Sequence, residues 1–366
     1  SQPSYDDRTI ALSYGSRCIF DSMGVWPLLA EQAEAIDSIH ISDRGHFGVT
    51  RLSSEQEGVE ALGYVLENRN IGQQLYQVMR ESADITLFCP AELKSLQQDI
   101  AHPDAEVSVD VMLDGSRQTL TAELLIAADG NNSQVMKVLN IGSSRKDYQQ
   151  SALITNITPG KKHDNVAYER FTDSGPLAFL PMTQNRCSVV WTLSPEQADY
   201  LYALDEADFL QQLQQRFGYR LGRIKKIGKR HIYPLFLQSA TQMVHGRVAL
   251  IGNAAHSVHP VAGQGFNLAL RDIAMLTELI SKAEDPGDSR LLQSYVEQRQ
   301  DDARRVYRFT DSLVKIFSND IAPMGHLRAA GLAAVGLIAP LRHQLARQSM
   351  GLSGRSSELA RRGGHV

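Results

Sequence analysis

The 366-residue chain is poor in cysteine, has no long apolar run and carries no excess of basic residues. Its three cysteines are scattered, which argues against a disulfide framework or a zinc site and favours reduced thiols in the cytoplasm. No segment approaches the roughly 18 to 20 uninterrupted apolar residues that a membrane-spanning helix needs. A formal net charge of −4 at pH 7 argues against a dedicated nucleic-acid binder. We therefore expect a cytoplasmic enzyme or binding protein that takes no nucleic acid.

The length allows two domains, and different patterns occur along the chain. Residues 152–193 contain four strand-like runs separated by Gly, Pro, Asp and Asn, and residues 206–217 have the apolar spacing of an amphipathic helix. Residues 106–113 alternate and meet Asp114-Gly115, which predicts a hairpin. Residues 70–79 predict a helix that Asn70 caps. A largely antiparallel domain therefore accounts for the middle of the chain.

Two short apolar runs predict strands of an α/β sheet that are buried on both faces. The first, residues 124–128, ends at Asp129-Gly130, and the second, residues 247–251, ends at Gly252-Asn253. A helix predicted from about 267 to 283 follows the second run. Because ligands of α/β sheets bind beyond the carboxyl ends of the strands, we expect a ligand site there. The two runs flank the antiparallel region, so the α/β domain is predicted to be discontinuous.

The densest signal is the stretch from Gly252 to Asp272, in which a glycine-rich turn joins the second strand to the helix. Gly263-Gln264-Gly265 lets the backbone approach a flat or anionic group. The free N–H groups and the positive dipole end of the helix would face that group. The alternative is a strand–turn–helix joint that binds no ligand.

Three motifs follow one another over nearly the whole chain. Arg8–Leu12 comes first, Asp129–Ser133 (D-G-N-N-S) comes second, and Gly252–Asp272 comes third, with Pro260 and Asn267 inside it. The third is similar to G-D-A-A-H-x-x-x-P-x-x-G-Q-G-x-N-x-x-x-x-D, the second flavin motif of single-component FAD-dependent aromatic monooxygenases. The second is similar to the D-G-x-x-S motif of that family, and the first to its segment in which an Arg approaches the FAD. The chain thus resembles this family.

The resemblance implies an α/β fold with three parts. These are a discontinuous, Rossmann-like FAD-binding domain similar to that of p-hydroxybenzoate hydroxylase, a mainly antiparallel β substrate domain, and a C-terminal helical segment. The expected boundaries are residues 1–38, 67–145 and 236–320 for the FAD-binding domain, 39–66 and 146–235 for the substrate domain, and 321–366 for the C-terminal segment.

Further residues are similar to the ubiquinone-biosynthesis branch of the family. They are Ser42–Gly45, Glu169–Phe171, Gly175–Met182, Tyr233–Leu235 and Thr310–Leu313. Within that branch the chain most resembles the 2-octaprenyl-6-methoxyphenol hydroxylases, in which an Asn also replaces the usual motif Asp. The amide of Asn253 still hydrogen-bonds a ribityl hydroxyl, and it keeps a carboxylate away from anionic reduced flavin.

The resemblance implies an FAD-dependent monooxygenase that hydroxylates a prenylated phenol in ubiquinone biosynthesis. It would use O2 and transiently bound NADPH or NADH, and would act through a C4a-hydroperoxyflavin. Two alternatives stay open. One is hydroxylation at another ring position of the same pathway, and the other is a non-catalytic subunit that binds quinone intermediates in the biosynthetic complex.

The resemblance also carries over the site residues. The implied FAD contacts are Arg8, Asp129, Gly130, Asn253, Pro260, Gly263, Gln264, Gly265, Phe266 and Asn267. Pro260, Gly263 and Gln264 are also the candidates for the flavin pocket in which catalysis occurs, and Pro176–Met182 is expected to wall the substrate side. The sequence identifies no phenol-activating base. His256 and His259 have no acidic or Cys partner at ligand spacing, so we expect no metal site.

Two positions depart from the family pattern. Lys137 stands where the D-G-x-x-S motif usually continues to an Arg, and it lacks the bidentate geometry of Arg. No G-x-G-x-x-G precedes Arg8, although that fingerprint should open the first βα turn roughly 30 to 40 residues upstream. Because the chain also begins at Ser1 instead of Met, we expect it to be part of a longer protein of about 400 residues.

Residues 321–366 contain six arginines and one acid, Glu358, around an apolar run from Ala329 to Leu341. The run is too short to span a bilayer. One interpretation is a core helix packed on the FAD-binding domain. The other is an interfacial helix whose arginines meet anionic lipid and whose apolar face guides a prenyl tail, at the inner face of the cytoplasmic membrane. Other ubiquinone-biosynthesis proteins are further expected partners.

Overall fold

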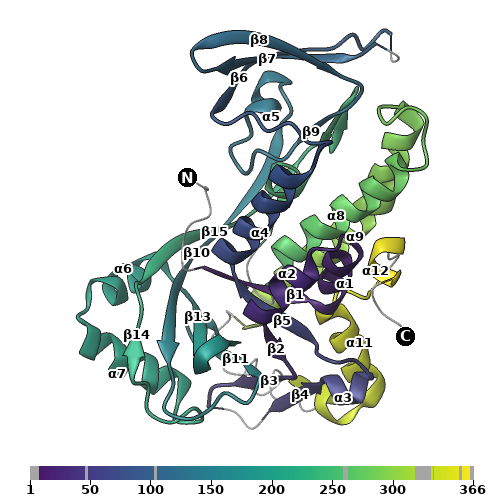
Figure 1. The fold of residues 1–366 in the computed structure, drawn as a ribbon. Coiled ribbons are helices and arrows are strands. Elements are labelled where there is room, and N and C mark those ends of the chain that lie inside the picture. The colour runs from purple at the N-terminus through teal and green to yellow at the C-terminus, as the bar shows by residue number, and fades with distance from the viewer. Residues whose placement is uncertain are drawn as a thin grey trace.

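The computed structural model describes residues 8–45, 48–102, 105–258, 263–317, 331–332, 334–353 and 357–362. In this part of the chain a large sheet lies beside a smaller α/β part, and a three-stranded sheet extends from the α/β part (Figure 1).

The large sheet has nine strands in the order β18-β15-β10-β13-β12-β11-β3-β4, with β14 paired to β10. Neighbouring strands are antiparallel except β11 and β3, which are parallel. The bounds are β3 (Ser38–Asp43), β4 (Val49–Ser53), β10 (Ser143–Thr158), β11 (Val166–Thr172), β12 (Gly175–Met182), β13 (Arg186–Leu193), β14 (Lys226–Ile227), β15 (His231–Ala240) and β18 (His256–Ser257). The four strands predicted within residues 152–193 are confirmed.

Two helices, α6 (Pro195–Ala203) and α7 (Glu206–Phe217), cover one face of the large sheet. The helix predicted at 206–217 is therefore confirmed, and the Asp205 carboxylate caps it by accepting a hydrogen bond from the Asp208 N–H. Beneath the helices lies an aromatic core in which the rings of Phe179 and Phe217 stack at 3.8 Å beside the buried Trp191. Apolar burial thus fixes which face of the sheet is closed, and the opposite face is turned toward the α/β part.

The α/β part contains two small sheets. One has the order β1-β5-β2 and the other β16-β17-β9, in which β17 and β9 are parallel. Their strands are β1 (Thr9–Ser13), β2 (Glu34–Ile36), β5 (Gly63–Glu67), β9 (Leu125–Ala127), β16 (Val244–His245) and β17 (Val248–Leu250). The helices around them are α1 (Tyr14–Ser22), α4 (Asn68–Glu81), α8 (Gln264–Ile280) and α9 (Ser289–Phe317), of which α8 and α9 lie side by side (Figure 1).

The two predicted buried strands differ in outcome. All three residues of β17 are 0% exposed, so the prediction for 247–251 is confirmed. The prediction that 124–128 is buried on both faces is wrong, because Ile126 is 41% exposed and Ala128 is exposed. The reason is that only one face of β9 is covered: Ala127 is 2% exposed, whereas the face that carries Ile126 is open within the described residues.

Two further predicted helices are present, but each begins at a different residue from the one predicted. α4 begins at Asn68, and its N-cap is Glu67 without a side-chain capping bond, so the prediction that Asn70 caps it is wrong. α8 begins at Gln264, three residues before the predicted start, because Gly263 adopts a left-handed φ of 61° at the N-cap. The hairpin at Asp114-Gly115 is confirmed, with positive φ at both residues.

The remaining elements are short or peripheral. The three-stranded sheet that extends from the α/β part is formed by β6 (Ala91–Gln97), β7 (Val107–Leu113) and β8 (Ser116–Ala122). The short helices are α2 (Trp26–Leu29), η1 (Ala30–Gln32), α3 (Ser54–Glu57), α5 (Gln134–Val138), η2 (Thr183–Asn185), η3 (Gly252–Ala254), α11 (Ala339–Ser349) and α12 (Glu358–Arg362). Among the described residues we find no helix with the length and apolarity needed to cross a bilayer. The domain boundaries stay a prediction.

A network of buried charges joins the turn after β17 to α8 and α9. His256 Nε2 lies 2.6 Å from Asp272 Oδ2, and Arg299 Nε lies 2.5 Å from Asp272 Oδ1. Arg299 Nη2 also lies 2.7 Å from Asp302 Oδ2, which Arg271 Nε approaches to 2.9 Å. Burial alone would raise the pKa of Asp272, but Arg299 and His256 hold that pKa below its usual value. The network therefore depends on a carboxylate that stays ionised without contact with water.

Replacing Asp272 by Asn should strongly destabilise the protein. The substitution leaves Arg299 and His256 buried without the carboxylate that they share, which costs about 3–5 kcal/mol of unfolding free energy. Urea denaturation at pH 7 measures this loss.

The control is Asp301→Asn on α9, the helix that carries Arg299, where the side chain is 74% exposed and a change of less than about 0.5 kcal/mol is expected. A lowered pKa stabilises the folded state fully above the unfolded-state value of about 4, and this contribution is lost as the pH falls through the lower folded-state value. The wild-type protein should therefore lose stability below about pH 4, more steeply than Asp272→Asn. Equal losses for Asp272→Asn and Asp301→Asn would contradict this account.

Candidate functional site

Two motif residues lie at one edge of the β17–β9 sheet. Because β9 and β17 are parallel, Asp129 and Asn253, which follow them, come to the same edge. Gly252 turns the chain there with a φ of 58°, and a Cβ on it would lie 3.8 Å from the Cβ of Ala269 in α8. The side chain of Asn253 is exposed at this turn. An amide in this position is accessible to a ligand that lies beyond the strand ends.

The D-G-N-N-S motif forms a capped turn. Asp129 Oδ2 accepts hydrogen bonds from the N–H groups of Gln134 (2.7 Å) and Val135 (3.2 Å), and Ser133 Oγ accepts one from Met136 N (3.0 Å). Gly130 has a φ of 83° that a larger residue rarely adopts. The motif thus holds the start of α5 in place, and the contacts of Asp129 and Gly130 with FAD stay predictions.

The N-terminus of α8 lies against β1. No side chain caps this helix, and a Cβ on Gly263 would lie only 3.3 Å from the Cβ of Ala11. Asn267 ties the two elements together, since its amide oxygen accepts from Ser13 N (2.8 Å) and its amide nitrogen donates to the carbonyls of Ala11 (2.9 Å) and Gly263 (2.7 Å). The positive end of a 17-residue helix is therefore fixed beside this strand.

The other residues of the helix start are placed by packing. Gln264 is buried, and the ring of Phe266 lies 6.4 Å from the ring of Phe20. Val258 Cγ2 would lie 3.4 Å from a Cβ on Gly265. Pro260 and His259 lie outside the described residues.

Arg8 directly precedes β1, and its guanidinium carbon lies 5.1 Å from the ring centroid of Tyr233. The Arg8 carbonyl accepts a hydrogen bond from the N–H of Asn68, the first residue of α4 (2.9 Å). Asn68 Oδ1 is buried and has no hydrogen-bond partner among the described residues. A buried acceptor of this kind takes its hydrogen bond from a water molecule or from a bound ligand. Sequence reasoning missed Asn68, because the helix was predicted to begin after it.

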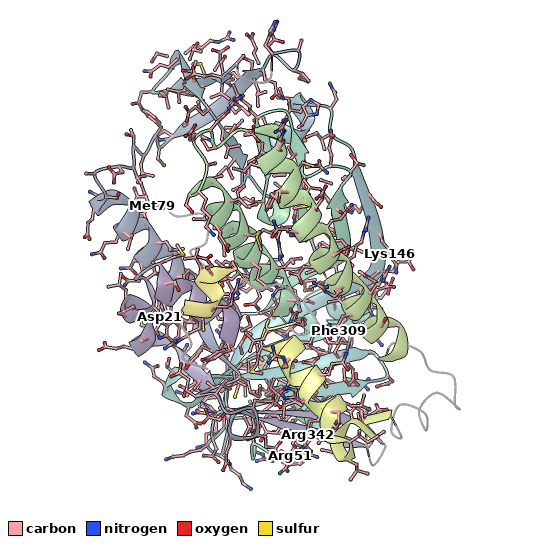
Figure 2. The ribbon with its side chains drawn as sticks, turned by 90° about the vertical axis from the view of Figure 1, so that its right-hand side faces the viewer. Asp21, Arg51, Met79, Lys146, Phe309 and Arg342 are labelled. Atoms are coloured by element: carbon pink, nitrogen blue, oxygen red, sulfur yellow. The ribbon has the colours of Figure 1, made fainter. Side chains whose placement is uncertain are left out.

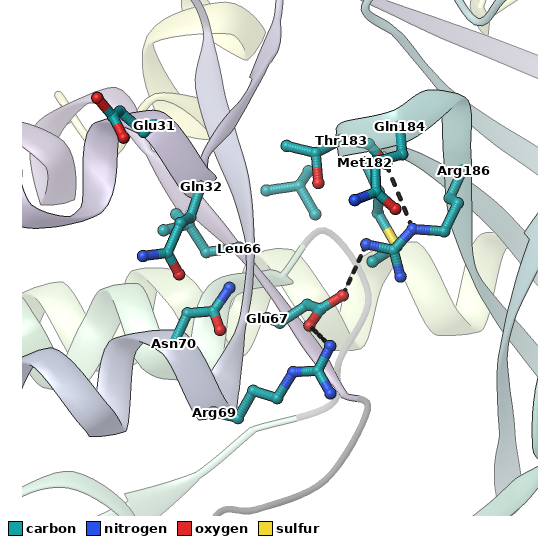
Figure 3. A pocket seen from close by; sticks show the side chains of 11 residues that line it. Glu31, Gln32, Leu66, Glu67, Arg69, Asn70, Met182, Thr183, Gln184 and Arg186 are labelled. Carbon is teal, nitrogen blue, oxygen red and sulfur yellow. Dashed lines mark hydrogen bonds and ion pairs between the residues drawn. The ribbon is translucent and has the colours of Figure 1, made fainter.

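A cavity of about 460 Å³ opens between the start of α4 and the β12–β13 connection (Figure 3). Glu67 lies in its wall at 7% side-chain exposure, paired with Arg69 and with Arg186 Nη2 at 2.9 Å. Met182, the last residue of the predicted substrate wall, also lines it. The Glu67–Arg186 pair connects β5 of the α/β part to β13 of the large sheet, and sequence reasoning missed it. In the described part of the chain no three acidic, His or Cys side chains gather as metal ligands would.

Comparison with known proteins identifies relatives that are similar in sequence over most of the chain. The family described as "FAD binding domain" matches residues 2–310. Ubiquinone hydroxylase UbiL of Rhodospirillum rubrum is 37% identical over 352 residues, which are 95% of this chain and 80% of that protein. The 3-demethoxyubiquinol 3-hydroxylase of Escherichia coli is 30% identical over 96% of this chain and 88% of its own length.

Solved structures share the fold. The p-nitrophenol 4-monooxygenase PnpA of Pseudomonas putida superposes with a TM-score of 0.78 at 16% identity, covering 97% of this chain and 90% of its own. HpxO of Klebsiella pneumoniae, solved with FAD and uric acid, has a TM-score of 0.71 at 16% identity, covering 94% of this chain and 87% of its own. The α/β fold with a mainly antiparallel second sheet is therefore the fold of flavoprotein hydroxylases, and FAD is the cofactor. The chain belongs to the FAD-dependent aromatic hydroxylases, in the branch of the ubiquinone hydroxylases.

Proposed function

We propose that the chain hydroxylates a prenylated phenol of ubiquinone biosynthesis, with FAD, O2 and NADPH or NADH. The observation that carries this proposal is the uncapped N-terminus of α8, held by Asn267 against β1 on the side of the large sheet that α6 and α7 leave open. A helix N-terminus stabilises negative charge, and reduced flavin is anionic around N1 and the C2 carbonyl.

The described residues fit the ribityl and ring end of FAD. The exposed amide of Asn253 would bond a ribityl hydroxyl, and the buried Asn68 Oδ1, which has no partner among the described residues, would accept from another donor. The absence of a side chain on Gly263 lets the start of α8 lie against β1, where its N–H groups would meet the flavin ring. Bound FAD would supply oxygen activation, which no protein side chain performs. The chain itself would orient the ring, stabilise its charge and exclude water.

Two alternative functions are compatible with the same fold and site, and they predict different products. Hydroxylation at another ring position would use the same residues and differ only in how the phenol ring lies on the large sheet. A non-catalytic subunit would bind quinone intermediates without reducing flavin.

Turnover of the FAD-reconstituted protein with a panel of short-chain prenylphenols distinguishes these readings. Hydroxylation coupled to NADPH oxidation is expected, with the product position determined by mass spectrometry and NMR. Flavin absorption bands near about 370 and 450 nm report the bound cofactor. Quinone binding without a flavin spectrum or a product would contradict the proposed function.

Gly263→Ala should weaken FAD binding about tenfold or more. The backbone strain of a side chain at a φ of 61°, roughly 1–2 kcal/mol, lowers stability with or without FAD. The added Cβ would also lie 3.3 Å from the Cβ of Ala11, so the start of α8, with the N–H groups that we propose meet the flavin, would have to move relative to β1. A tenfold loss of affinity corresponds to about 1.4 kcal/mol. Fluorescence titration with FAD measures the affinity. The matched control is Gly58→Ala, which has a φ of 70° but nothing within 4 Å of an added Cβ. It carries the same backbone cost and should bind FAD as the wild type does, so equal effects in both variants would count against the site.

We also propose that the C-terminal segment contacts a membrane surface. Leu332 is buried against Phe171 of the large sheet, whereas Leu337, Ile338 and Leu341 are 84%, 47% and 42% exposed. Arg342 of α11 and Arg51 of β4 lie at the same end of the molecule (Figure 2). Exposed aliphatic side chains beside cations suit an anionic lipid surface, where a prenylated substrate would also lie.

The triple variant Leu337→Ser, Ile338→Ser and Leu341→Ser should lose binding to anionic vesicles in a flotation assay. The wild type should float with vesicles that contain phosphatidylglycerol and bind more weakly to neutral vesicles, because both apolar burial and charge contribute. Tyr200→Ser with Tyr219→Ser removes two exposed rings elsewhere on the surface (61% and 67% exposed) and should leave flotation unchanged. Failure of the wild type to bind either kind of vesicle would refute the contact.

A further inference from the structure

Glu169 lies on the face of β11 that is turned away from α6 and α7. Side chains alternate along a strand, and Tyr168 packs into the core beneath those helices, with its ring 5.4 Å from that of Phe217. Ala167 and Phe171 pack on the other side, against different clusters. Glu169 stands between them in sequence and therefore shares their face.

That face is the one to which β1 is bound. Thr9 Oγ1 of β1 donates a hydrogen bond to Ser188 Oγ of β13 (2.7 Å), and Ser188 is paired with Leu180 of β12. Two residues before Leu180, Ala178 is paired with Glu169. Glu169 is thus two strands and two residues away from the contact with β1, roughly 12 Å from strand and residue spacings. An aromatic ring bridges much of that distance.

The surroundings of Glu169 are apolar. Its register partners are Ala178 on β12 and Ile41 on β3, and Leu332 packs on the neighbouring Phe171. With the described residues the half-buried Glu169 side chain makes no hydrogen bond or ion pair. Burial raises the pKa of Glu169 to about 7.

One other titratable group belongs to this face in the described elements packed against Glu169. It is Asp43 of β3, the register partner of Phe171, whose carboxylate attracts the Arg170 guanidinium. β12 contributes no titratable side chain here, nor do the described residues among 331–338. A carboxyl that finds no partner among the described residues in such surroundings is costly to the fold, and such a cost is tolerated at functional positions.

We propose that Glu169 is the base that takes the proton from the phenol hydroxyl of the substrate. This inference rests on the proposed function and adds the group that activates the ring. The phenol O–H bond breaks, the proton bonds to a carboxylate oxygen of Glu169, and the electron pair stays on the phenol oxygen. The added electron density makes the ring carbons ortho and para to that oxygen more nucleophilic. Glu169 returns the proton to water after the product leaves.

The raised pKa of Glu169 suits a base that takes a proton from a phenol near pH 7. A phenol resembles the side chain of Tyr, with a pKa of about 10, and is mostly neutral at pH 7. A general base works best when its pKa is near the working pH, and a typical contribution is about 10²–10⁴-fold. An ordinary exposed glutamate, with a pKa of about 4.3, would be a weaker base.

Glu169→Gln should lower the rate of hydroxylation about 10²–10⁴-fold and remove the acidic limb near pH 7 from the kcat/KM profile. FAD affinity and the anaerobic rate of flavin reduction by NADPH should stay unchanged, since the side chain does not belong to the flavin-binding turn. The variant should fold at least as stably as the wild type above pH 7, because the wild-type carboxylate is desolvated there. The matched control is Glu206→Gln, an exposed carboxylate on α7 across the sheet.

A second readout needs no turnover. The infrared C=O band of a protonated carboxyl should titrate near pH 7 in the wild type and be missing from Glu169→Gln. A variant that hydroxylates at the wild-type rate with the acidic limb intact, or an infrared titration that it shares with the wild type, would overturn the assignment of Glu169 alone. A wild-type protein that hydroxylates no phenol while reducing its flavin would overturn the proposed function, and this inference with it.

Discussion

The arrangement of the molecule depends on the contact that the buried Asp272 carboxylate makes with Arg299 and His256. Three elements meet there: the turn after β17, helix α8 and helix α9. A carboxylate at 0% exposure is tolerated because the Arg299 guanidinium donates a hydrogen bond to it and the His256 ring lies beside it. Since the turn carries Asn253 and Gly263 directly precedes α8, this charge fixes the spacing of the two residues that we propose contact the flavin.

A second constraint connects β1, against which α8 begins, to the large sheet. β1 is only five residues long, yet Asn267 binds it on one side and Thr9 joins it to Ser188 on the other. The Glu67–Arg186 ion pair is a second connection between the two parts, because it joins β5 to β13. The two halves of the site differ in character. The half that we propose for the cofactor consists of backbone groups, glycines and a helix N-terminus, whereas on the face of the large sheet Glu169 has the apolar register partners Ala178 and Ile41.

The parts that were predictable from the sequence depend on local chemistry. The glycine-rich turn, the hairpin at Asp114-Gly115 and the amphipathic helix at 206–217 each follow from residues that are close in the chain. The parts that were missed depend on distant partners. Exposure of Ile126 follows from which face of β9 is covered, the burial of Asn68 follows from the contact of α4 with residue 8, and the positions of Arg186 and Glu169 follow from strand register over long separations. A single sequence does not encode such register in any short pattern.

The most direct test of the account is a crystal structure of the protein with FAD and a prenylphenol bound. The account predicts the flavin ring at the N-terminus of α8, with Asn253 in hydrogen-bond distance of a ribityl hydroxyl. It also places the phenol ring on the face of the large sheet opposite α6 and α7. A flavin ring bound away from Gly263–Asn267, or a phenol on the face that α6 and α7 cover, would contradict it.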